Sequence, residues 1–357
     1  MIEHHHFDAF MPASFHGSAP DRLFRFLGGV AAPTFLFLAG LAMVLMMEGR
    51  LAKGESRRAA MGTAFKRGLW IFLGAYAFRF QEWALAFGAS PASSMLRIDV
   101  LNCIGVALML TALLWGLGLG LRARAVWFFL AAVLTVGFAP PIWHADLSGW
   151  PPVLASYVNG RSPAALFPLF PWMGFCFVGG LAGLLLVRAR RAADPDRAEV
   201  VAILGLVTFA GFLWVGTRAV DGLPFQLYAK TEWWLDSPAY FLLRCCSEVW
   251  LLAGCWMVEK LARPLWARLP AGPLLKLGQH SLLVYWVHIE IVYGRFTWRL
   301  RGQLSFAQAA FALALLLLAM VALSYAADPI SRRLAAWLAR GRQRLGRKGA
   351  PRKLSPG

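Results

Sequence analysis

Ionisable side chains inside long apolar stretches are the most informative feature of the sequence. They recur at matched depth in separate stretches, and the set is Arg79, Glu82, Asp99, Arg244, Glu248, His288 and Glu290. Because such groups are costly in hydrocarbon, they indicate a functional site within a membrane. A histidine, which ionises near pH 6.5, can take a proton from an amine or hydroxyl, as acyl transfer requires. The same groups could instead line a transport path.

The segment before the first apolar stretch supplies the candidate bases. His16 lies in a polar loop next to Gly17, where a substrate could approach, and His5 lies in a run of three histidines. Asp8 could orient either ring. The structural alternative is that these histidines are simply solvated. We take His16, His5 and Asp8 as the candidate catalytic residues.

Two arginines in the apolar stretches have a carboxylate one helical turn away. Arg79 and Glu82 are three residues apart, and Arg244 and Glu248 are four residues apart. Each pair could neutralise itself along one helix face, which would make its role structural. The alternative is that the arginines bind substrate.

Three further polar residues are candidates for the same substrate site. Asp99 and Asn102 are three residues apart at the predicted outer start of a helix, where a carboxylate is also favoured electrostatically. His288 lies in the outer half of its helix, one turn after Tyr285, although a histidine bonded to a neighbouring helix is the structural alternative. Since the depths match, we expect a substrate site formed by Asp99, Asn102, Arg244, His288 and Arg79.

The elements that must position these residues are transmembrane helices. The apolar fraction is 59%, charged residues make up 15% and the mean hydropathy is +0.57. An ordinary soluble domain has about 45–50% apolar and about 25% charged residues. Residues 26–47 contain no charge and are long enough to cross a hydrocarbon core of about 30 Å. The sequence predicts an all-α, polytopic transmembrane helical bundle.

Nine spans are predicted, in a single domain that covers residues 1–329. The spans are residues 26–47, 68–87, 98–118, 125–140, 166–187, 199–218, 238–258, 277–294 and 305–327. The first residues of the chain resemble the end of a helix, so we expect a truncated first span that would make ten. Residues 330–357 are predicted to form a basic cytoplasmic tail, amphipathic at first and disordered at its end.

The distribution of positive charge predicts the orientation in the membrane. The net charge is +18, and most of the 36 Lys and Arg residues fall in the loops after alternate spans and in the tail. By the positive-inside rule, these loops and the C-terminus are cytoplasmic. Arg295, Arg299 and Arg301 are exceptions on the predicted outer side. Because topology explains the basic residues, nucleic acid is not expected as a partner.

Several smaller features concern packing and the outer loops. The five cysteines lie in apolar runs without the paired spacing of disulfides or metal sites, so no metal is expected. Gly179 and Gly183 would allow close helix packing. Pro168 and Pro171 free backbone carbonyls that another group must bind. The aromatic and acidic residues of loops 140–165 and 220–237 could stack on sugar rings or anchor the protein at the membrane interface.

Five segments resemble the bacterial transmembrane acyltransferases related to heparan-alpha-glucosaminide N-acetyltransferase. They follow in the family's order over nearly the whole chain: Ala32–Gly40, Ile98–Gly105, Phe167–Gly174, Gly179–Gly183 and Leu277–His288. The Arg-Gly element that starts the family's first helix is missing, in agreement with a truncated start. His5 falls where the family has a polar helix end, and His16 where it has a loop histidine. The resemblance implies that the histidine acts as general base or as transient acetyl carrier.

The resemblance also implies the substrates and the location. Acetyl-CoA, the co-substrate, would approach from the cytoplasmic side, and the acetyl group would reach an amine or hydroxyl of a saccharide on the outer side. The membrane would be a bacterial cytoplasmic (inner) membrane, and a homodimer is possible. Candidate contacts to acyl-CoA are Arg57, Arg58, Lys66, Arg67 and His280, although topology alone explains the basic ones. The alternatives are a membrane transporter or flippase for a small polar or glycan-linked substrate, and a non-catalytic scaffold.

Overall fold

The computed structural model describes residues 1–88, 90–161, 164–221, 227–266 and 272–348. These residues form helices joined by turns and loops, and no strand occurs among them. The chain divides into two compact units. The first unit comprises Arg22–Leu261 together with Met1, and the second unit comprises Ile2–Asp21 and Ala262–Gly357. The predicted all-helical class is confirmed for the part of the chain that the structure describes.

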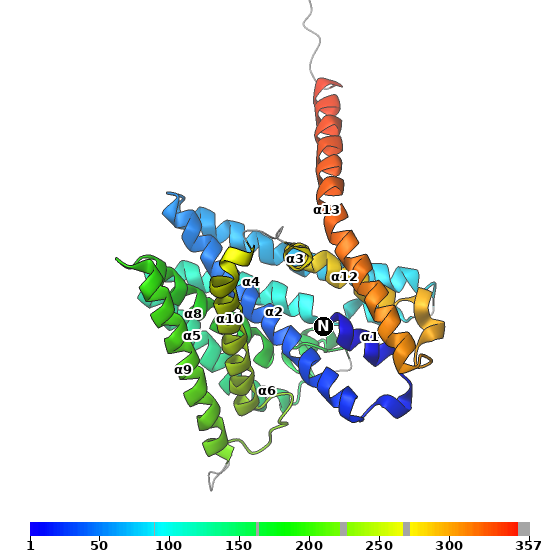
Figure 1. Ribbon diagram of the computed structural model, residues 1–357, viewed down its shortest axis with the longest axis horizontal. Helices are drawn as coiled ribbons and strands as arrows, with labels where there is room; N and C mark the ends of the chain where they lie inside the picture. The colour runs from blue at the N-terminus through cyan, green and yellow to red at the C-terminus, as the bar shows by residue number, and fades with distance from the viewer. Residues whose placement is uncertain (89, 162–163, 222–226, 267–271, 349–357) are drawn as a thin grey trace, which may run out of the picture. The chain divides into compact units, whose positions relative to one another are not determined.

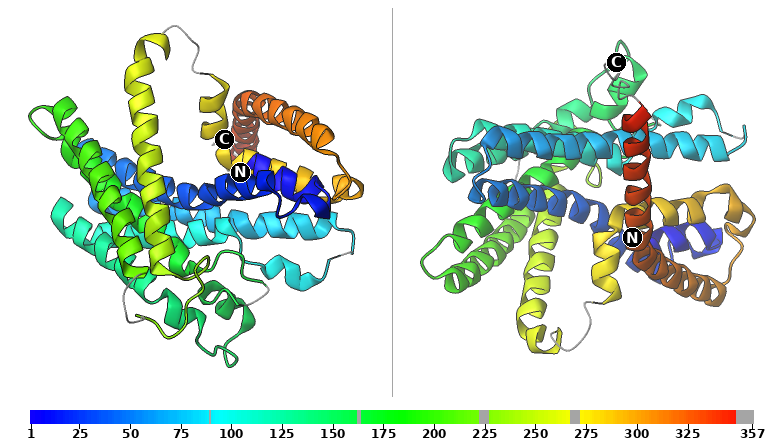
Figure 2. Two further views of the ribbon diagram at one scale, coloured as in Figure 1. Left: turned by 60° about the horizontal axis from the view of Figure 1, so that its bottom comes forward. Right: turned by 90° about the horizontal axis from the view of Figure 1, so that it is seen from above.

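The first unit is built from long helices with short helices in the loops between them (Figure 1). Its elements are α2 (Ala19–Ala52), α3 (Arg57–Leu85), η2 (Ala92–Leu96), α4 (Val100–Leu117), α5 (Leu121–Gly137), α6 (Ala139–Trp143), α7 (Pro152–Val158), α8 (Leu169–Arg190), α9 (Pro195–Asp221) and α10 (Pro238–Trp266). α3 runs side by side with α4 (Figure 2), and α8 packs against α4, α5 and α9.

Glycines bring α2 and α8 into close contact. A Cβ atom added at Gly179 would lie 1.9 Å from the carbonyl oxygen of Phe37, and one added at Gly40 would lie 1.9 Å from that of Cys176. Gly183 likewise faces the backbone of Leu41. The predicted packing role of the glycine-rich segment is therefore confirmed, because no larger residue fits where the two backbones meet.

Local sequence signals begin several of these helices. The side chain of Ser56 accepts a hydrogen bond from Ala59 N and caps α3. The prolines predicted to free carbonyls lie at the start of α8: Pro168 precedes the helix, and Pro171 follows the non-helical Phe170. The carbonyl of Phe170 accepts a hydrogen bond from Trp143 Nε1 at 2.7 Å. The prolines thus begin the helix rather than interrupt it, and the carbonyl before Pro171 has a partner.

Six helices in the described residues are long and apolar enough to cross a membrane: α2, α4, α8, α9, α10 and α13 (Phe306–Lys348). They coincide with six of the nine predicted spans. The other three predicted spans fall on α3, which carries several charges, on α5 with 17 residues, and on α12 (Ser281–Tyr293) with 13. The count of about nine is therefore not confirmed.

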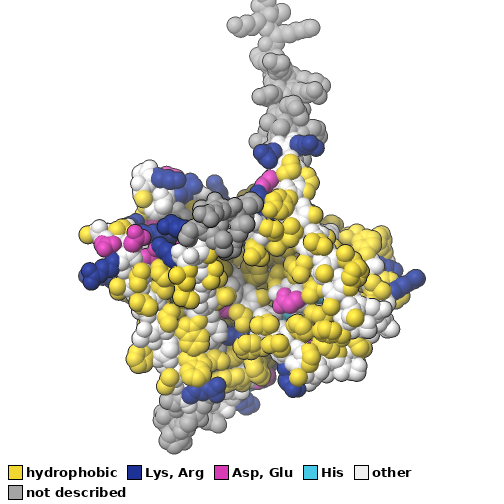
Figure 3. Space-filling view, in the orientation of Figure 1, with side chains coloured by type: hydrophobic (Ala, Val, Ile, Leu, Met, Phe, Trp, Pro, Cys, Tyr) yellow, Lys and Arg dark blue, Asp and Glu magenta, His cyan; other side chains and the backbone are white. Residues whose placement is uncertain are grey.

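The surface of the long helices suits a lipid environment. Large apolar side chains are exposed along α9, among them Val201, Leu204, Phe209 and Phe212. Figure 3 shows hydrophobic side chains covering the visible face of α9 and α10. In water such a surface would be a liability, whereas in hydrocarbon it costs nothing to expose. The protein is an integral membrane protein.

The second unit consists of α1 (Ile2–Phe10), η1 (Ala13–Phe15), α11 (Pro273–Gln279), α12, η3 (Arg295–Leu300) and α13. α1 contacts both α12 and α13. The hydrophobic core of the second unit contains Phe10, Val284, Val292, Leu316 and Met320. The backbone of α13 continues as one helix to Lys348. The amphipathic character predicted for residues 330–357 depends mainly on side chains after Arg333, which lie outside the described residues.

Candidate functional site

The N-terminal helix α1 is held against α13 by the two residues that follow His5. His6 Nε2 donates a hydrogen bond to the carbonyl of Ala309 at 2.9 Å, and the His6 side chain is buried. The ring of Phe7 stacks on that of Phe306, with the centroids 5.7 Å apart. These contacts hold α1 against the start of α13, so the preceding residue, His5, has a defined position.

His5 belongs to a hydrogen-bonded chain of three residues. Tyr293 OH donates to Asp8 Oδ2 at 3.1 Å, and the hydroxyl oxygen of Tyr293 lies 3.2 Å from His5 Nδ1. Because the tyrosine proton is directed to the carboxylate, the tyrosine oxygen accepts from His5 Nδ1–H. This assignment leaves His5 Nε2 with its lone pair. The arrangement is that of a base whose tautomer is set by an orienting group.

A second imidazole lies beside the first. The rings of His5 and His288 have centroids 5.6 Å apart, and Tyr285 lies 5.7 Å from His288 on the same helix. His288 is fully buried, and its Nδ1 donates to the carbonyl of Val284 at 2.7 Å. Its Nε2 therefore also carries a lone pair. Two basic nitrogens thus come from α1 and α12.

The surroundings of His5 favour the neutral ring. Burial lowers the pKa of His5 to about 4, and the neighbouring His288 adds to this shift. A ring with this pKa is unprotonated at every pH above about 5. The lone pair of His5 is therefore available at neutral pH, and this unprotonated form is the one that a general base needs.

The structure separates the predicted catalytic residues into two places in the second unit. His5 and Asp8 lie in the cluster with His288, as described above. His16 follows η1 instead, with Nδ1 3.6 Å from Asp21 Oδ1 and its ring against that of Phe15. About a third of the His16 side chain is exposed (32%).

The first unit contains a second polar cluster, which is formed around Asp99. Arg79 Nη2 lies 3.0 Å from Asp99 Oδ2, and Arg79 also binds Glu82 on its own helix. Asp99 caps α4, because its Oδ1 accepts from Leu101 N and Asn102 N while Asn102 Oδ1 accepts from Asp99 N. Both predicted roles of Asp99 are therefore compatible: it starts the helix and it binds a buried arginine.

Two tyrosines extend this cluster. Asn102 Nδ2 donates to Tyr157 OH at 3.3 Å, and Tyr157 OH lies 2.6 Å from Tyr76 OH. The network therefore joins α3, α4 and α7. The sequence indicates Tyr157 only as one of the loop aromatics and gives no signal for Tyr76, since nothing in their spacing relates either residue to Asn102.

Arg244 has partners on α2 and α10. Its Nε donates to Tyr240 OH at 2.8 Å, and its guanidinium lies over the rings of Phe26 and Tyr240. A Cβ atom at Gly29 would lie 3.0 Å from Arg244 Nη2. The ion pair with Glu248, which the sequence left open as a structural alternative, does not occur among the contacts of the described residues. The partners of Arg244 and those of Asp99 belong to different helices.

The residues expected to bind CoA occupy two regions. His280 lies between α11 and α12, where its Nε2 is 3.1 Å from Asp328 Oδ1, and Lys276 binds the same carboxylate. This places His280 in a tie between α11 and α13 of the second unit. The basic candidates of the first unit lie along the first half of α3: Arg57, Arg58, Lys66 and Arg67.

The sequence interpretation missed a buried cluster around Glu48. The carboxylate of Glu48 accepts from Trp115 Nε1 at 2.9 Å, from Arg124, and from Arg191 Nη2 at 2.8 Å. Arg124 also lies over the indole of Trp115. The cluster joins the ends of α2, α4 and α8 to the start of α5. A single glutamate directly after a long apolar run was the only available signal.

A further polar cluster joins two loop segments of the first unit. His144 Nε2 lies 3.2 Å from Asp236 Oδ2, and Arg161 Nη2 donates to His144 Nδ1 at 2.6 Å. Asp236 is fully buried, and burial raises its pKa. Asp236 also accepts from Glu232 N at 2.6 Å. For these two loops the sequence indicates only sugar stacking or interface anchoring, and it gives no signal that His144 pairs with Asp236.

The cysteines form no disulfide and belong to no metal site among the described residues. All five cysteines are free, and four are buried. Among the residues that the structure describes, no three His, Cys, Asp or Glu side chains gather as a metal site would require.

Comparison with known proteins identifies one family. The family model described as heparan-alpha-glucosaminide N-acetyltransferase, catalytic, matches residues 1–214. No curated protein matches the chain. The matched region contains α1 and most of the long helices of the first unit.

Proposed function

Because the chain belongs to the heparan-alpha-glucosaminide N-acetyltransferase catalytic family, we propose that it transfers an acetyl group from acetyl-CoA to a saccharide amine or hydroxyl. The observation that supports this activity most directly is the chain of contacts from Asp8 through Tyr293 to His5. Acyl transfer requires a base held in one tautomer close to the acceptor. The contacts that fix the His5 tautomer support its assignment as this base.

In the proposed reaction the amine nitrogen or hydroxyl oxygen of the acceptor attacks the thioester carbonyl. At the same time, His5 Nε2 takes the proton of that amine or hydroxyl. The new bond between the acceptor and the acetyl carbon forms while the carbon–sulfur bond breaks. The proton then passes from His5 to the departing CoA thiolate. Tyr293 and Asp8 keep Nδ1 protonated throughout, and His288 supplies a second nitrogen at which the proton can be held.

Binding of the two substrates is assigned to separate groups. We assign the phosphates of CoA to Arg57, Arg58, Lys66 and Arg67, because guanidinium and ammonium groups bind phosphate well. His280 remains a proposed contact on the same, cytoplasmic side. Asp99, Asn102, Arg79 and Arg244 are the proposed acceptor-binding residues, since hydroxyl and amine groups need such donors and acceptors. The proposed location is a bacterial cytoplasmic membrane with the C-terminus inside.

The decisive experiment measures acetyl transfer from labelled acetyl-CoA to a panel of amino sugars by purified protein. We expect His5→Ala to lower kcat/KM by about 100-fold or more, as for loss of a general base. Tyr293→Phe should lower it by about 10-fold, because the base keeps its place but loses the group that fixes its tautomer.

His16→Ala is the matched control for this assignment. If His16→Ala abolishes transfer and His5→Ala does not, the base is His16 and the assignment to His5 is wrong. A parallel measurement of thermal unfolding should show stabilisation by CoA, since a ligand that binds only the folded protein raises its stability. Absence of transfer to every acceptor, together with absence of CoA stabilisation, would reject the proposed function.

A further inference from the structure

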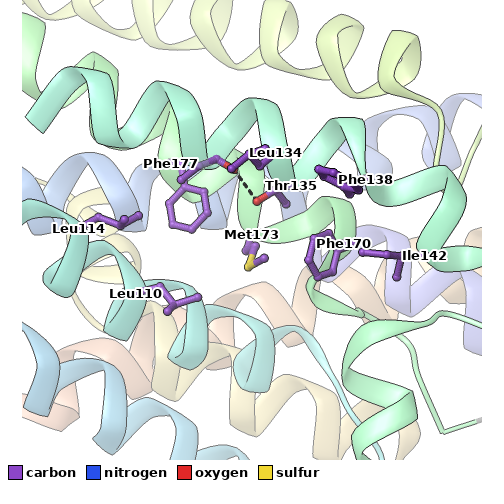
Figure 4. A pocket seen from close by; sticks show the side chains of 10 residues that line it. Leu110, Leu114, Leu134, Thr135, Phe138, Ile142, Phe170, Met173 and Phe177 are labelled. Atoms are coloured by element: carbon purple, nitrogen blue, oxygen red, sulfur yellow. Dashed lines mark hydrogen bonds between the residues drawn. The ribbon is translucent and has the colours of Figure 1, made fainter. Parts of the chain in front are cut away.

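An apolar groove runs along the first unit between α4, α5 and α8 (Figure 4). Its volume is about 370 Å³, within the range of about 300–1,000 Å³ that is usual for small-molecule sites. Its walls are hydrocarbon: Leu110, Leu114, Ala131, Leu134, Phe138, Ile142, Phe170, Met173 and Phe177. Thr135 is the one hydroxyl residue in this lining, and its oxygen donates to the carbonyl of Ala131.

The groove opens to the lipid-facing surface of α4 and α5. Leu113 on α4 and Val133 on α5 are exposed beside it, and Leu134 and Phe138 of the lining are themselves more than half exposed (54% each). Water would find almost no polar partner in such a groove, so a hydrocarbon chain is the favoured occupant. The open side allows a chain to enter from the bilayer.

One end of the groove is joined to a cationic group. Ile142 lines the groove, and its carbonyl accepts a hydrogen bond from Asn159 Nδ2 at 3.1 Å. The Oδ1 atom of the same asparagine accepts from Arg161 N at 2.8 Å. Gly160 between them lies against the indole of Trp143, where a Cβ atom would be 2.2 Å from the ring. Arg161 is thus held beside the end of the groove.

The guanidinium of Arg161 is exposed and keeps its positive charge. It donates to His144 Nδ1, which must be the unprotonated nitrogen of a neutral ring. His144 Nε2 lies 3.2 Å from Oδ2 of the buried Asp236. Asp236 therefore contacts the imidazole, and no contact between Asp236 and Arg161 occurs among the described residues. An anion can approach the exposed guanidinium.

We propose that this groove binds the hydrocarbon chain of a lipid phosphate that carries the acceptor sugar, with Arg161 bound to the phosphate. The inference rests on the proposed acetyl transfer and adds the substrate class: the acceptor is lipid-linked. A hydrocarbon wall followed at one end by a guanidinium matches an amphiphile with an anionic head group. Anchoring also raises the local concentration of the acceptor at the protein.

The first test measures binding without any chemistry. The purified protein is labelled with a short-chain isoprenyl phosphate that has a photoreactive group on its chain. We expect labelling within the peptides of α5 and α8, and competition by unlabelled isoprenyl phosphate. Arg161→Gln should weaken competition about 10-fold, with Arg161→Lys in between, because one charge-assisted contact is lost. Equal competition by the phosphate-free alcohol or by phosphatidylglycerol would show an ordinary bilayer lipid and overturn the proposal.

A matched pair of variants tests the groove itself. Ala131→Trp places a large side chain in the groove, whereas Val133→Trp places the same side chain on the exposed surface two residues away. We expect Ala131→Trp to reduce labelling at least about 10-fold and Val133→Trp to leave it unchanged. Equal labelling of the two variants would overturn the proposal. Equal melting temperatures would confirm that both are folded.

A transfer assay separates this proposal from the proposed function. Wild-type protein should acetylate both a soluble amino sugar and a lipid-linked amino sugar phosphate, with the larger kcat/KM for the latter. Ala131→Trp should lose only that advantage. If the wild type acetylates the soluble sugar alone, or the variant lowers both reactions equally, the lipid-linked acceptor is wrong and acetyl transfer stands. If neither sugar is acetylated and CoA does not stabilise the protein, acetyl transfer is wrong, and the labelling result decides the groove by itself.

Discussion

The protonation of His5 gives the sharpest test of the proposed base. With a pKa of about 4, the ring should be about 3% protonated at about pH 5.5. A solvated imidazole would be about 90% protonated at the same pH. The difference follows from burial of the ring and from the adjacent His288, both of which disfavour the imidazolium ion.

The measurement is NMR of protein labelled with ¹³C at the histidine rings. The chain contains only seven histidines, so the resonance of His5 can be assigned as the one that is absent from the His5→Gln spectrum. We expect no titration of that resonance above about pH 5, with free histidine in the same sample as the reference. A midpoint near 6.5 for His5 would refute the reasoning, because the ring would then be solvated and not held in the cluster.

The same shift has a consequence for stability. The pKa of His5 is lower in the folded protein than the ordinary value of 6.5, so the unfolded chain binds more protons between these two values. The contribution of His5 to the free energy of unfolding is therefore fully present above about pH 6.5. It is lost as the pH falls towards about 4, by about 3 kcal/mol in total. His5→Gln should remove this part of the acid sensitivity. An identical pH dependence of the melting temperature in variant and wild type would contradict the contribution of His5 to acid sensitivity.

Three substitutions test other features of the first unit. Glu48→Leu should lower the free energy of unfolding by about 3–5 kcal/mol in denaturant unfolding, because it leaves two bound arginines without their buried carboxylate. The control Glu55→Gln, at a partly exposed ion pair, should cost less than about 1 kcal/mol in the same assay. Gly179→Ala should lower the melting temperature sharply, because Gly179 is in contact with the backbone of α2. Gly205→Ala should not, because the space around Gly205 is open. Equal effects of the two substitutions would show that the helices can move apart. Asp99→Ala should lower stability by about 2–4 kcal/mol in the same unfolding assay through loss of the cap and of the arginine partner, and a change below about 0.5 kcal/mol would contradict both roles.

Some features of the fold could be predicted because they depend on local composition. The apolar runs predict helices, and each of the nine predicted spans falls on a helix, although only six helices are long and apolar enough to be assigned as spans. The difference arises from α3, which carries several charges, and from α5 and α12, which are shorter than the helices assigned as spans. Asp99 and Asn102 were recognisable as a helix start for the same reason: a capping box is defined by neighbours in sequence.

The candidate site was predictable only in part. His5, Asp8 and His288 were singled out by residue type and by the family resemblance, and the structure brings them together. The role of Tyr293 in linking His5 to Asp8 had no sequence signal, because its partners lie more than 280 positions away in the chain. Of the two ion pairs that helix spacing permits, Arg79 with Glu82 forms, whereas Arg244 binds Tyr240 and lies over the ring of Phe26 instead. Spacing on a helix permits a contact, but neighbouring rings can compete for it.

The sequence by itself determined that this chain is a helical membrane protein of an acetyltransferase family, because hydropathy and family motifs are properties of contiguous residues. Only the tertiary structure decided which polar groups meet: Tyr293 with His5, Glu48 with Arg191, and His144 with Asp236. Each of these pairs joins different helices or loops. In an apolar interior every buried polar group needs a partner, and helix packing rather than position in the chain selects it.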